Sequence, residues 1–360
     1  MHLPRARQEF LLREVELRGS VRSAEAAARL GVSEVTIRRD IIELDRAGKL
    51  ARVHGGAVAR RSARGPEAAR AIVGVMVPST THHFPPLIRG MEALAPELRV
   101  RLVLGVSHYH PEVEQAQVER LVALGAAGLA IAPTTHRRHA ADVVAWATSI
   151  PIPVVLVERS LDGVARAREL DVVRTDHVYG AALGVEHLAG LGHERIGLAV
   201  YDRTPTAPSV REGFARAAQS LGLRSGPDAV LPKGEDDPAS LTDVLARFLD
   251  ECRESGTDAV LAHTDYHAAR LVETALDRGW RIPEDLAVVA YDDENAELAA
   301  IPLTAVTPPR LEVGREALQL LVDRVNDPDP VSRPTRHLDL LPRLTIRASC
   351  GAHPRGEAHT

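Results

Sequence analysis

Residues 33–44 of this chain read SEVTIRRDIIEL, and this stretch decides the fold of the N-terminal region. Ile37, Ile41 and Leu44 recur at helical spacing, which predicts a helix with one buried apolar face. Ser33 can cap that helix through its hydroxyl, and Gly31 tolerates the positive φ that ends a preceding helix. The stretch therefore predicts two helices joined by a short turn.

The residues on either side extend this pattern to a small domain. Phe10, Leu11, Val15 and Leu17 form an apolar stripe typical of a first helix. A second helix is expected over residues 24–30, with Ser23 as its N-cap. After the predicted helix end at Gly48, residues 49–58 (KLARVHGGAV) predict a short hairpin, or wing.

Several side chains of the third helix point away from the predicted core. At about 100° per residue these are Val35 and Arg39, with Thr36 and Arg38 on the flanks. The second and third helices, joined by a glycine-containing turn, match helix-turn-helix geometry. In that geometry the later helix, which here exposes the arginines, enters the major groove of DNA. Arginine both reads guanine and neutralises phosphate. The alternative is that Arg38 and Arg39 form only a solvated helix face.

A longer stretch of sequence favours the DNA-binding interpretation over a solvated helix face. SEVTIRRD at 33–40, with Leu44, Gly48, Leu50 and Arg52 and then HGGA at 54–57, resembles the winged helix-turn-helix domain of the DeoR family. The signature of that family is VS-x-x-T-[IV]-R-R-D-L with a closing R-x-HGGA. Ile41 departs from it, because the family usually has leucine there.

The resemblance implies that Ser33, Thr36, Arg38 and Arg39 contact DNA, and that Arg52 and His54 lie on or beside the wing. Asp40 is expected to pair with a nearby arginine, because phosphates would repel a carboxylate. With the outward-facing valine added, the candidate DNA-binding residues are Ser33, Val35, Thr36, Arg38, Arg39, Arg52 and His54.

The charge is divided unevenly along the chain. Of 360 residues, 44 are Lys or Arg and 49 are Asp or Glu. Residues 1–70 hold 15 of the former and 9 of the latter, which leaves 29 and 40 for the remainder: +6 in front and −11 behind. A basic head on an acidic body favours a head that binds a polyanion. Residues 59–70 (ARRSARGPEAAR) read as a linker.

Other classes of protein and of site are disfavoured. Residues 122–133, the longest apolar stretch, are too short to span a membrane, and residues 1–18 lack the apolar run of a signal peptide, so we expect a cytoplasmic protein. Cys252 and Cys350 match no metal-ligand spacing. Neither the histidine pair at 108 and 110 nor that at 136 and 139 has an obvious third ligand, so no metal is expected. No cofactor and no enzymatic activity are expected either.

After residue 70, short apolar runs alternate with amphipathic helices. This βαβ pattern predicts parallel sheets with helices on both faces, and about eight strands favour two adjacent sheets. The cleft between two such lobes lies at the carboxyl ends of the strands, where ligands bind. The expected strands are 72–77, 100–106, 128–132, 154–157, 171–175, 195–200, 258–262 and 286–290.

Three strings in this body resemble the effector domain of the LacI family, which is related to periplasmic sugar-binding proteins. They are PVVLVER at 153–159, GVEHLAGLGHERIGLA at 184–199 and GWRIPEDLAVVAYDD at 279–293. The usual head and hinge helix of that family are absent. We therefore expect an α/β protein: a small winged helix-turn-helix domain at 1–58, a linker at 59–70, a two-lobed periplasmic-binding-protein-like domain with parallel sheets at 71–347, and a tail at 348–360. The first lobe is expected at 71–159 plus 296–326, and the second at 160–295 plus 327–347.

The resemblance also implies an effector pocket. Phe84 would lie against the ligand, Arg211 of the R-x-GF motif would donate to ligand oxygens, and Asp292 would accept from hydroxyls. The alternatives are a packing ring, a surface arginine and a turn cap. Asp176 and Asp265 are as well explained by helix caps as by ligand contacts. The candidate effector residues are Ser79, His83, Phe84, Arg159, Asp176, Arg211, Thr264, Asp265 and Asp292.

These features together predict a DNA-binding transcriptional regulator, a repressor, whose affinity for operator DNA is controlled by a sugar or similar polar metabolite. Partners are expected to be double-stranded DNA, the effector and a second copy of the chain, as a homodimer or dimer of dimers. One alternative is a cytoplasmic sugar-binding protein. Another is an enzyme that acts on sugar phosphates, because DeoR-type heads usually precede such a domain. Thr264 stands where the LacI family commonly has asparagine, so the effector identity stays open.

Overall fold

A computed structural model divides the chain into two compact units, Met1–Arg70 and Ala71–Thr360. We describe each unit by itself. The structure describes residues 7–8, 10–12, 14–15, 20–46, 49–53, 55–58, 71–81, 83–136, 138–159, 161, 163–233, 238–329 and 333–352.

The first unit is a small helical domain with a three-stranded antiparallel sheet. Its sheet has the order β1-β3-β2, so the predicted hairpin is confirmed and β1 is an additional strand. The buried side chains include Leu11, Ile37, Ile41 and Leu44, as the sequence pattern predicts. The elements are β1 (Ser20–Arg22), α2 (Ser23–Leu30), α3 (Glu34–Arg46), β2 (Ala51–Val53) and β3 (Gly56–Val58).

The ends of α2 show one predicted cap and one correction. Gly31 ends the helix with φ 63°, as expected. The prediction of Ser23 as N-cap is wrong, because Ser23 is the first helical residue and Arg22 takes the cap position without a side-chain bond. The reason is strand pairing: β1 runs directly into α2, and the Ser23 amide donates to the Gly55 carbonyl at 2.8 Å.

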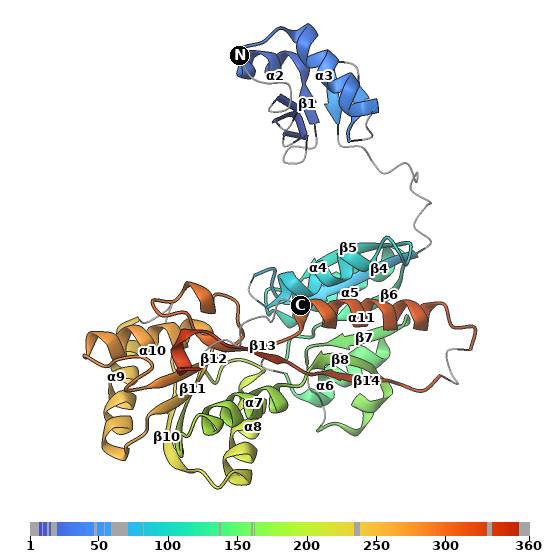
Figure 1. The fold of residues 1–360 in the computed structure, drawn as a ribbon. Coiled ribbons are helices and arrows are strands. Elements are labelled where there is room, and N and C mark those ends of the chain that lie inside the picture. Colours follow the sequence, from blue (N-terminus) through green and yellow to red (C-terminus); the bar gives the residue numbers. More distant parts are fainter. Residues whose placement is uncertain are drawn as a thin grey trace, which may run out of the picture. The chain divides into compact units, whose positions relative to one another are not determined.

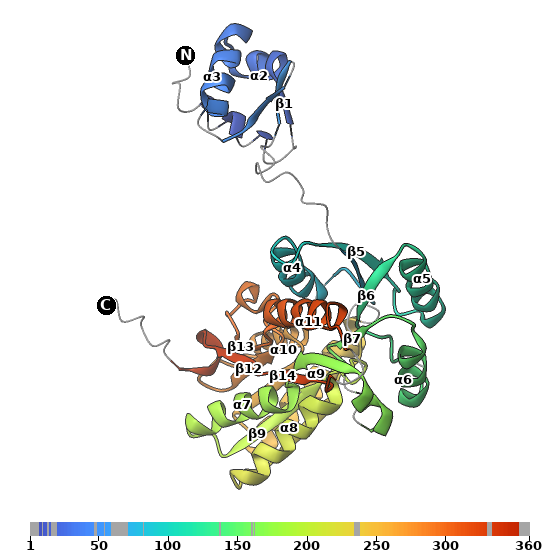
Figure 2. The same ribbon diagram turned by 90° about the vertical axis from the view of Figure 1, so that its right-hand side faces the viewer.

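The first lobe of the second unit is a six-stranded sheet of order β14-β8-β7-β6-β4-β5, with every pair parallel. One apolar cluster packs α4 and α11 on one face, and another packs α5 and α6 on the other (Figure 2). Its elements are β4 (Ala71–Val77), α4 (Phe84–Leu94), β5 (Val100–Val106), α5 (Pro111–Ala123), β6 (Ala126–Ile131), α6 (Ala140–Ser149), β7 (Val154–Val157), a 3-10 turn (Ala165–Glu169), β8 (Asp171–Thr175), α11 (Arg310–Val325) and β14 (His337–Leu340).

The second lobe lies beside the first (Figure 1) and has the sheet order β10-β9-β11-β12-β13-β15, in which only the pair β13–β15 is antiparallel. Helices α7 and α8 share one apolar cluster with the sheet, and α9 and α10 share another. Its elements are α7 (His177–Gly190), β9 (Arg195–Val200), α8 (Ala207–Ser220), β10 (Arg224–Val230), α9 (Pro238–Ser255), β11 (Ala259–His263), α10 (Asp265–Asp277), β12 (Ala287–Tyr291), β13 (Thr304–Thr307), β15 (Arg343–Thr345) and two 3-10 turns (Ala296–Leu298 and Ala348–Cys350).

The expected lobe boundaries are wrong at three places. Strand β8 was expected in the second lobe but pairs with β7 of the first. Strand β13 was expected in the first lobe but pairs with β12 of the second, and β14, expected in the second, pairs with β8 of the first. The physical reason is that the chain crosses between the two lobes three times, after β8, after β13 and between β14 and β15, so each sheet is built from separate parts of the sequence.

Helices α4 and α11 touch backbone to backbone at two glycines. A Cβ atom on Gly90 would lie 2.0 Å from the Leu311 carbonyl oxygen, and one on Gly314 would lie 2.0 Å from the Leu87 carbonyl oxygen. Neither oxygen belongs to a flexible side chain that could turn away. This close approach fixes the position of α11, whose first residue is Arg310.

We predict that Gly314→Ala lowers the free energy of unfolding by about 1–3 kcal/mol, because α11 must move away from α4 to admit the methyl group. Urea titration with tryptophan fluorescence measures the change. Gly190→Ala is the matched control: its Cβ would meet nothing within 4 Å, so the variant should be as stable as the wild type or slightly more stable. Equal losses in the two variants would contradict the close-packing argument.

Candidate functional site

The N-terminus of α3 is held by two hydroxyl groups. The Ser33 Oγ accepts from the Thr36 amide at 3.2 Å and lies 2.8 Å from the Thr36 Oγ1. Ser33 is therefore a helix cap, as predicted, and both hydroxyls already have one intramolecular partner. Ile37 and Ile41 are buried against α2 and the first helix, so the opposite side of α3 faces outward.

That outward side carries three of the predicted DNA-binding residues. Val35 is 75% exposed. The Arg39 side chain is 83% exposed, and its Nε lies 3.7 Å from Glu43. Arg38 is 61% exposed and forms a 2.6 Å hydrogen bond with Glu34, one turn earlier. An exposed helix N-terminus flanked by arginines matches the surface that helix-turn-helix domains insert into the major groove.

Asp40 is turned inward and forms an ion pair within the domain. Its two carboxylate oxygens accept from the Arg7 Nε at 2.7 Å and Nη2 at 3.0 Å, and the residue is 4% exposed. The expectation that Asp40 pairs with an arginine is confirmed. Arg52 is exposed on β2, as predicted for the wing, whereas His54 lies outside the described residues.

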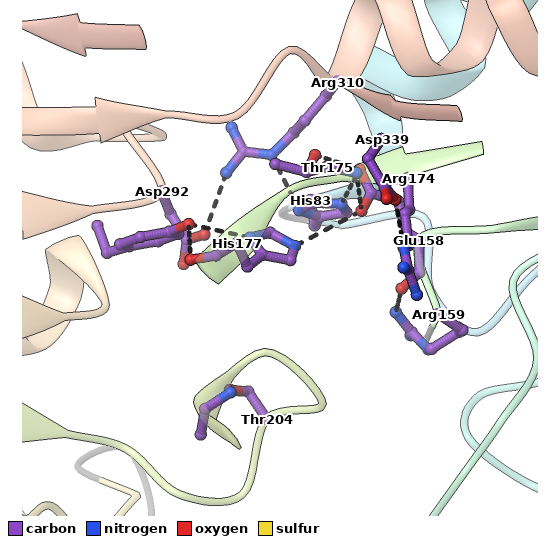
Figure 3. A network of polar contacts seen from close by, with 12 residues as sticks. His83, Glu158, Arg159, Arg174, Thr175, His177, Thr204, Asp292, Arg310 and Asp339 are labelled. Atoms are coloured by element: carbon purple, nitrogen blue, oxygen red, sulfur yellow. Dashed lines mark hydrogen bonds and ion pairs between the residues drawn. The ribbon is translucent and has the colours of Figure 1, made fainter. Parts of the chain in front are cut away.

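In the second unit, a network of polar side chains joins the two lobes at the carboxyl ends of their strands (Figure 3). Its centre is Glu158, which follows β7 and has a side chain only 1% exposed. The carboxylate accepts from the Thr175 hydroxyl at 2.9 Å and from the Thr175 amide at 3.3 Å. Burial alone would raise the pKa of Glu158, but its contacts with His83 and His177 outweigh burial and hold that pKa well below the ordinary value.

His83 links this carboxylate to Arg310 of α11. The Arg310 Nε donates to the His83 Nδ1 at 2.9 Å, so the proton of a neutral imidazole must be on Nε2. That Nε2 lies 3.3 Å from the Glu158 Oε1. The same guanidinium donates to Asp292 at 3.4 Å across the lobe junction, as Figure 3 shows.

His177 makes the second link between the lobes. It is the first residue of α7, and its Nε2 lies 3.6 Å from the Glu158 Oε2 in the first lobe. Its Nδ1 lies 3.1 Å from the hydroxyl of Tyr291, at the end of β12 in the second lobe. The Tyr291 hydroxyl also lies 3.3 Å from the His177 carbonyl oxygen, so it has two acceptors in reach.

Asp292 contributes the carboxylate of the second lobe. It follows β12 with a positive φ of 101° and faces Arg310. Burial alone would raise its pKa, but the Arg310 charge holds that pKa below the ordinary value. Burial and the Asp292 charge have the opposite effect on Asp265, where they raise the pKa to about 7. The pKa values of these two carboxylates are thus shifted in opposite directions.

Two predicted effector residues are buried together. Phe84 is 3% exposed within the first-lobe core, and the Arg159 guanidinium lies 5.6 Å from its ring centre. Arg159 donates to the carbonyl oxygens of Pro133 at 3.1 Å and Glu158 at 2.8 Å. Burial lowers the Arg159 pKa. The packing alternative for Phe84 is therefore observed, and its contact with an effector stays a prediction.

The other predicted effector residues have partners within the protein. Arg211 donates to Asp202 at 3.0 Å and to Asp228 at 2.7 Å. Asp176 accepts from the Tyr179 amide as the N-cap of α7, which is the alternative the sequence offered. Asp265 accepts from two amides of the loop after β12, and the remaining two, Ser79 and Thr264, contact Thr81 and His267.

The sequence reasoning missed Thr175 and three further residues of the network. Arg310, His177 and Tyr291 were not singled out, although each stands next to a predicted strand or helix end. Their partners are far away in sequence: Arg310 is 227 residues from His83, and Tyr291 is 114 from His177. A single sequence carries no signal for such pairs.

Among the described residues, no group of three or more His, Cys, Asp or Glu could hold a metal ion. In the same part of the chain, no helix is long and apolar enough to cross a membrane.

We predict that Glu158→Gln destabilises the second unit by about 1–3 kcal/mol at pH 7, because the amide replaces a buried acceptor that faces two imidazoles. The depressed pKa of Glu158 stabilises the fold above the ordinary glutamate pKa and ceases to do so as the pH falls through its folded value. The difference between variant and wild type should therefore shrink below about pH 4.5. Urea titrations at several pH values test this, and a constant difference would contradict it.

Each of the two units is similar to a known protein family. Residues 7–63 match the model of the DeoR-like helix-turn-helix domain, and residues 185–350 match that of the periplasmic binding protein-like domain. The HTH-type transcriptional repressor PurR of Haemophilus influenzae is 26% identical over 76% of this chain and 80% of its own length. The arabinose metabolism transcriptional repressor of Geobacillus stearothermophilus is 26% identical over 84% of this chain and 83% of its own.

The fold has solved counterparts as well. A complex of the transcriptional regulator CelR with cellobiose superposes with a TM-score of 0.65 at 21% identity, over 90% of this chain and 98% of that chain. A LacI family transcriptional regulator from Enterococcus faecium with bound ribose superposes with a TM-score of 0.58 at 24% identity, over 78% of this chain and 98% of that chain. These similarities establish the mixed α/β fold with parallel sheets.

Proposed function

We propose that this chain, which matches the models of a DeoR-like helix-turn-helix domain and a periplasmic binding protein-like domain, is a transcriptional regulator that represses transcription under the control of a sugar. The head binds operator DNA, and a sugar at the junction of the two lobes changes the affinity for that DNA. The observation that carries the proposal is the network at that junction, in which Glu158 and Arg310 of one lobe face His177 and Asp292 of the other. A bound effector would compete for those same groups.

The surface of α3 supports the DNA half of the proposal. Arg38 and Arg39 are exposed beside the helix N-terminus, and the first 70 residues carry a charge of +6. A positive surface on a small domain attracts phosphates and raises the rate of association with DNA. The acidic body, at −11, would be repelled by DNA, which leaves the head as the contacting part.

The chemistry of the lobe junction supports the sugar half. Sugar hydroxyls need acceptors and donors arranged in pairs, and Glu158 and Asp292 supply carboxylates while Arg159 and Arg310 supply guanidinium groups. One protein similar to this chain is named as a repressor of arabinose metabolism, and another was solved in complex with cellobiose. We propose the same chemical class, a neutral sugar, for the effector of this chain.

Coupling follows if the effector binds one arrangement of the lobes more tightly than another. An effector that contacts Glu158 in the first lobe and Asp292 in the second would fix the lobes relative to each other. Such coupling is typically about 1–3 kcal/mol, or roughly 5–150-fold in affinity for DNA.

We also propose that the regulator is a homodimer. Helix-turn-helix proteins commonly bind two half-sites with two copies of the head, which matches the symmetry of the operator. Leu104 on the edge strand β5 is 44% exposed and Leu298 is 77% exposed, so apolar surface is available on both lobes. Light scattering coupled to size-exclusion chromatography measures the mass, and a monomer at micromolar concentration would contradict this proposal.

We predict that Arg39→Ala weakens binding to the DNA upstream of the chain's own gene at least tenfold, because it removes a base-reading or phosphate-neutralising group. Gel-shift titration at two salt concentrations measures the affinity and its salt dependence. Arg216→Ala is the control, because Arg216 is also a largely exposed arginine, on α8 of the body, and this variant should bind like the wild type. Absence of binding by the wild type at low salt would refute the DNA half.

We predict that one of arabinose, ribose or cellobiose raises the melting temperature of the full chain by about 5–10 °C at saturation, because a ligand that binds only the folded state stabilises it. Asp292→Asn should reduce that shift, because the amide donates where a carboxylate accepts. Asp243→Asn, an exposed position on α9, should leave the shift unchanged. A shift that persists in full in Asp292→Asn would refute the assignment of the site.

A further inference from the structure

The recognition surface of α3 contains one apolar side chain without a function in the fold. Val35 is 75% exposed, whereas the other aliphatic residues of the helix, Ile37, Ile41 and Leu44, are at most 3% exposed and Ile42 is half-buried. A β-branched residue is also a poorer helix former than alanine at such a position. Neither stability nor helix propensity therefore explains why valine stands here.

Most polar groups around Val35 already have a close partner within the protein, and Arg39 has the most distant one. The hydroxyls of Ser33 and Thr36 contact each other, and Arg38 is held by Glu34 at 2.6 Å. Arg39 lies farther from its acidic neighbour Glu43, at 3.7 Å, and is the more exposed of the two arginines. Arg39 can therefore reorient toward DNA at a smaller cost than Arg38.

Val35 and Arg39 are four positions apart in the sequence and therefore lie on one face of the helix. Their Cα atoms are about 6 Å apart along the helix axis, and base pairs are stacked at about 3.4 Å, so the two side chains reach positions within about two base pairs of each other. In the major groove, thymine presents an apolar 5-methyl group and guanine presents the acceptors N7 and O6. These are the base edges that complement a valine and an arginine fork.

We propose that Val35 and Arg39 determine the operator sequence, with Val35 packing on the 5-methyl group of a thymine and Arg39 donating to N7 and O6 of a guanine within two base pairs of it. This inference rests on the proposed DNA-binding function. It assigns Arg38 to the phosphate backbone, because its pairing with Glu34 holds it at the flank.

The test changes single functional groups of the DNA bases. Operators are first selected from random duplexes by the full chain, and each thymine of the selected half-site is then replaced by deoxyuridine, which lacks only the methyl group. Burial of one methyl group corresponds to about a fourfold change in affinity. We expect a loss of about three- to fivefold at one thymine per half-site with the wild type, and no loss at that thymine with Val35→Ala.

Replacement of the neighbouring guanine by 7-deazaguanine removes N7 in the same way. This change should weaken the wild type at least fivefold and leave Arg39→Ala unaffected. Val230→Ala, which truncates an exposed valine on β10 of the body, is the control and should keep both sensitivities. Circular dichroism melts verify that each variant is folded.

The outcomes separate the two proposals. If no duplex is selected, the DNA-binding function itself fails. If duplexes are selected but no thymine is sensitive to loss of its methyl group, or the sensitivity is the same in Val35→Ala, the assignment of Val35 is wrong while the function stands. If N7 removal costs as much in Arg39→Ala as in the wild type, the assignment of Arg39 is wrong.

Discussion

The carboxylate of Glu158 is the group around which the lobe junction is organised. A buried charge must be hydrogen-bonded or paired, because desolvation otherwise costs several kcal/mol. In the first lobe the Thr175 amide and hydroxyl, at the end of the crossing strand β8, supply the bonds. His83 and His177 then approach the remaining lone pairs from the starts of α4 and α7. The requirement to satisfy one carboxylate thus places strand ends and helix starts of both lobes against each other.

Arg310 extends this arrangement, because its guanidinium meets partners on both sides of the junction. It donates to His83 in the first lobe and to Asp292 in the second. The position of Arg310 depends on α11, which the glycine contacts between α4 and α11 fix on the first lobe. A ligand that binds Asp292 must therefore share or replace a bond with a group that belongs to the other lobe. The hydrogen bonds that hold the two lobes together therefore involve the same groups that an effector would bind.

Local sequence patterns predicted the elements well and the long-range pairs poorly. The apolar period of Ile37, Ile41 and Leu44 is a property of one helix, so it was readable from one sequence. Carboxylates at strand ends, such as Asp292, were found for the same reason, since strand ends follow from the apolar runs. The lobe boundaries failed because the apolar pattern of a strand such as β13 fits either sheet, and only the packing of the folded chain decides with which sheet it pairs. The pair of Arg310 and His83, 227 residues apart, required the fold itself.

The way in which effector binding could reach the DNA follows from the position of β4. This strand begins at Ala71, directly after the predicted linker, and is paired on both sides, with β5 and β6. A strand with two complete ladders cannot slide alone without breaking both, so a change at the junction moves the first lobe as a unit. If residues 59–70 are the predicted linker, movement of one first lobe alone has little effect on its own head. Two first lobes in a dimer, however, would change the distance between two heads, and half-site spacing makes DNA affinity sensitive to that distance. A dimer formed by the body would therefore connect effector binding at the lobe junction to the spacing of the two heads.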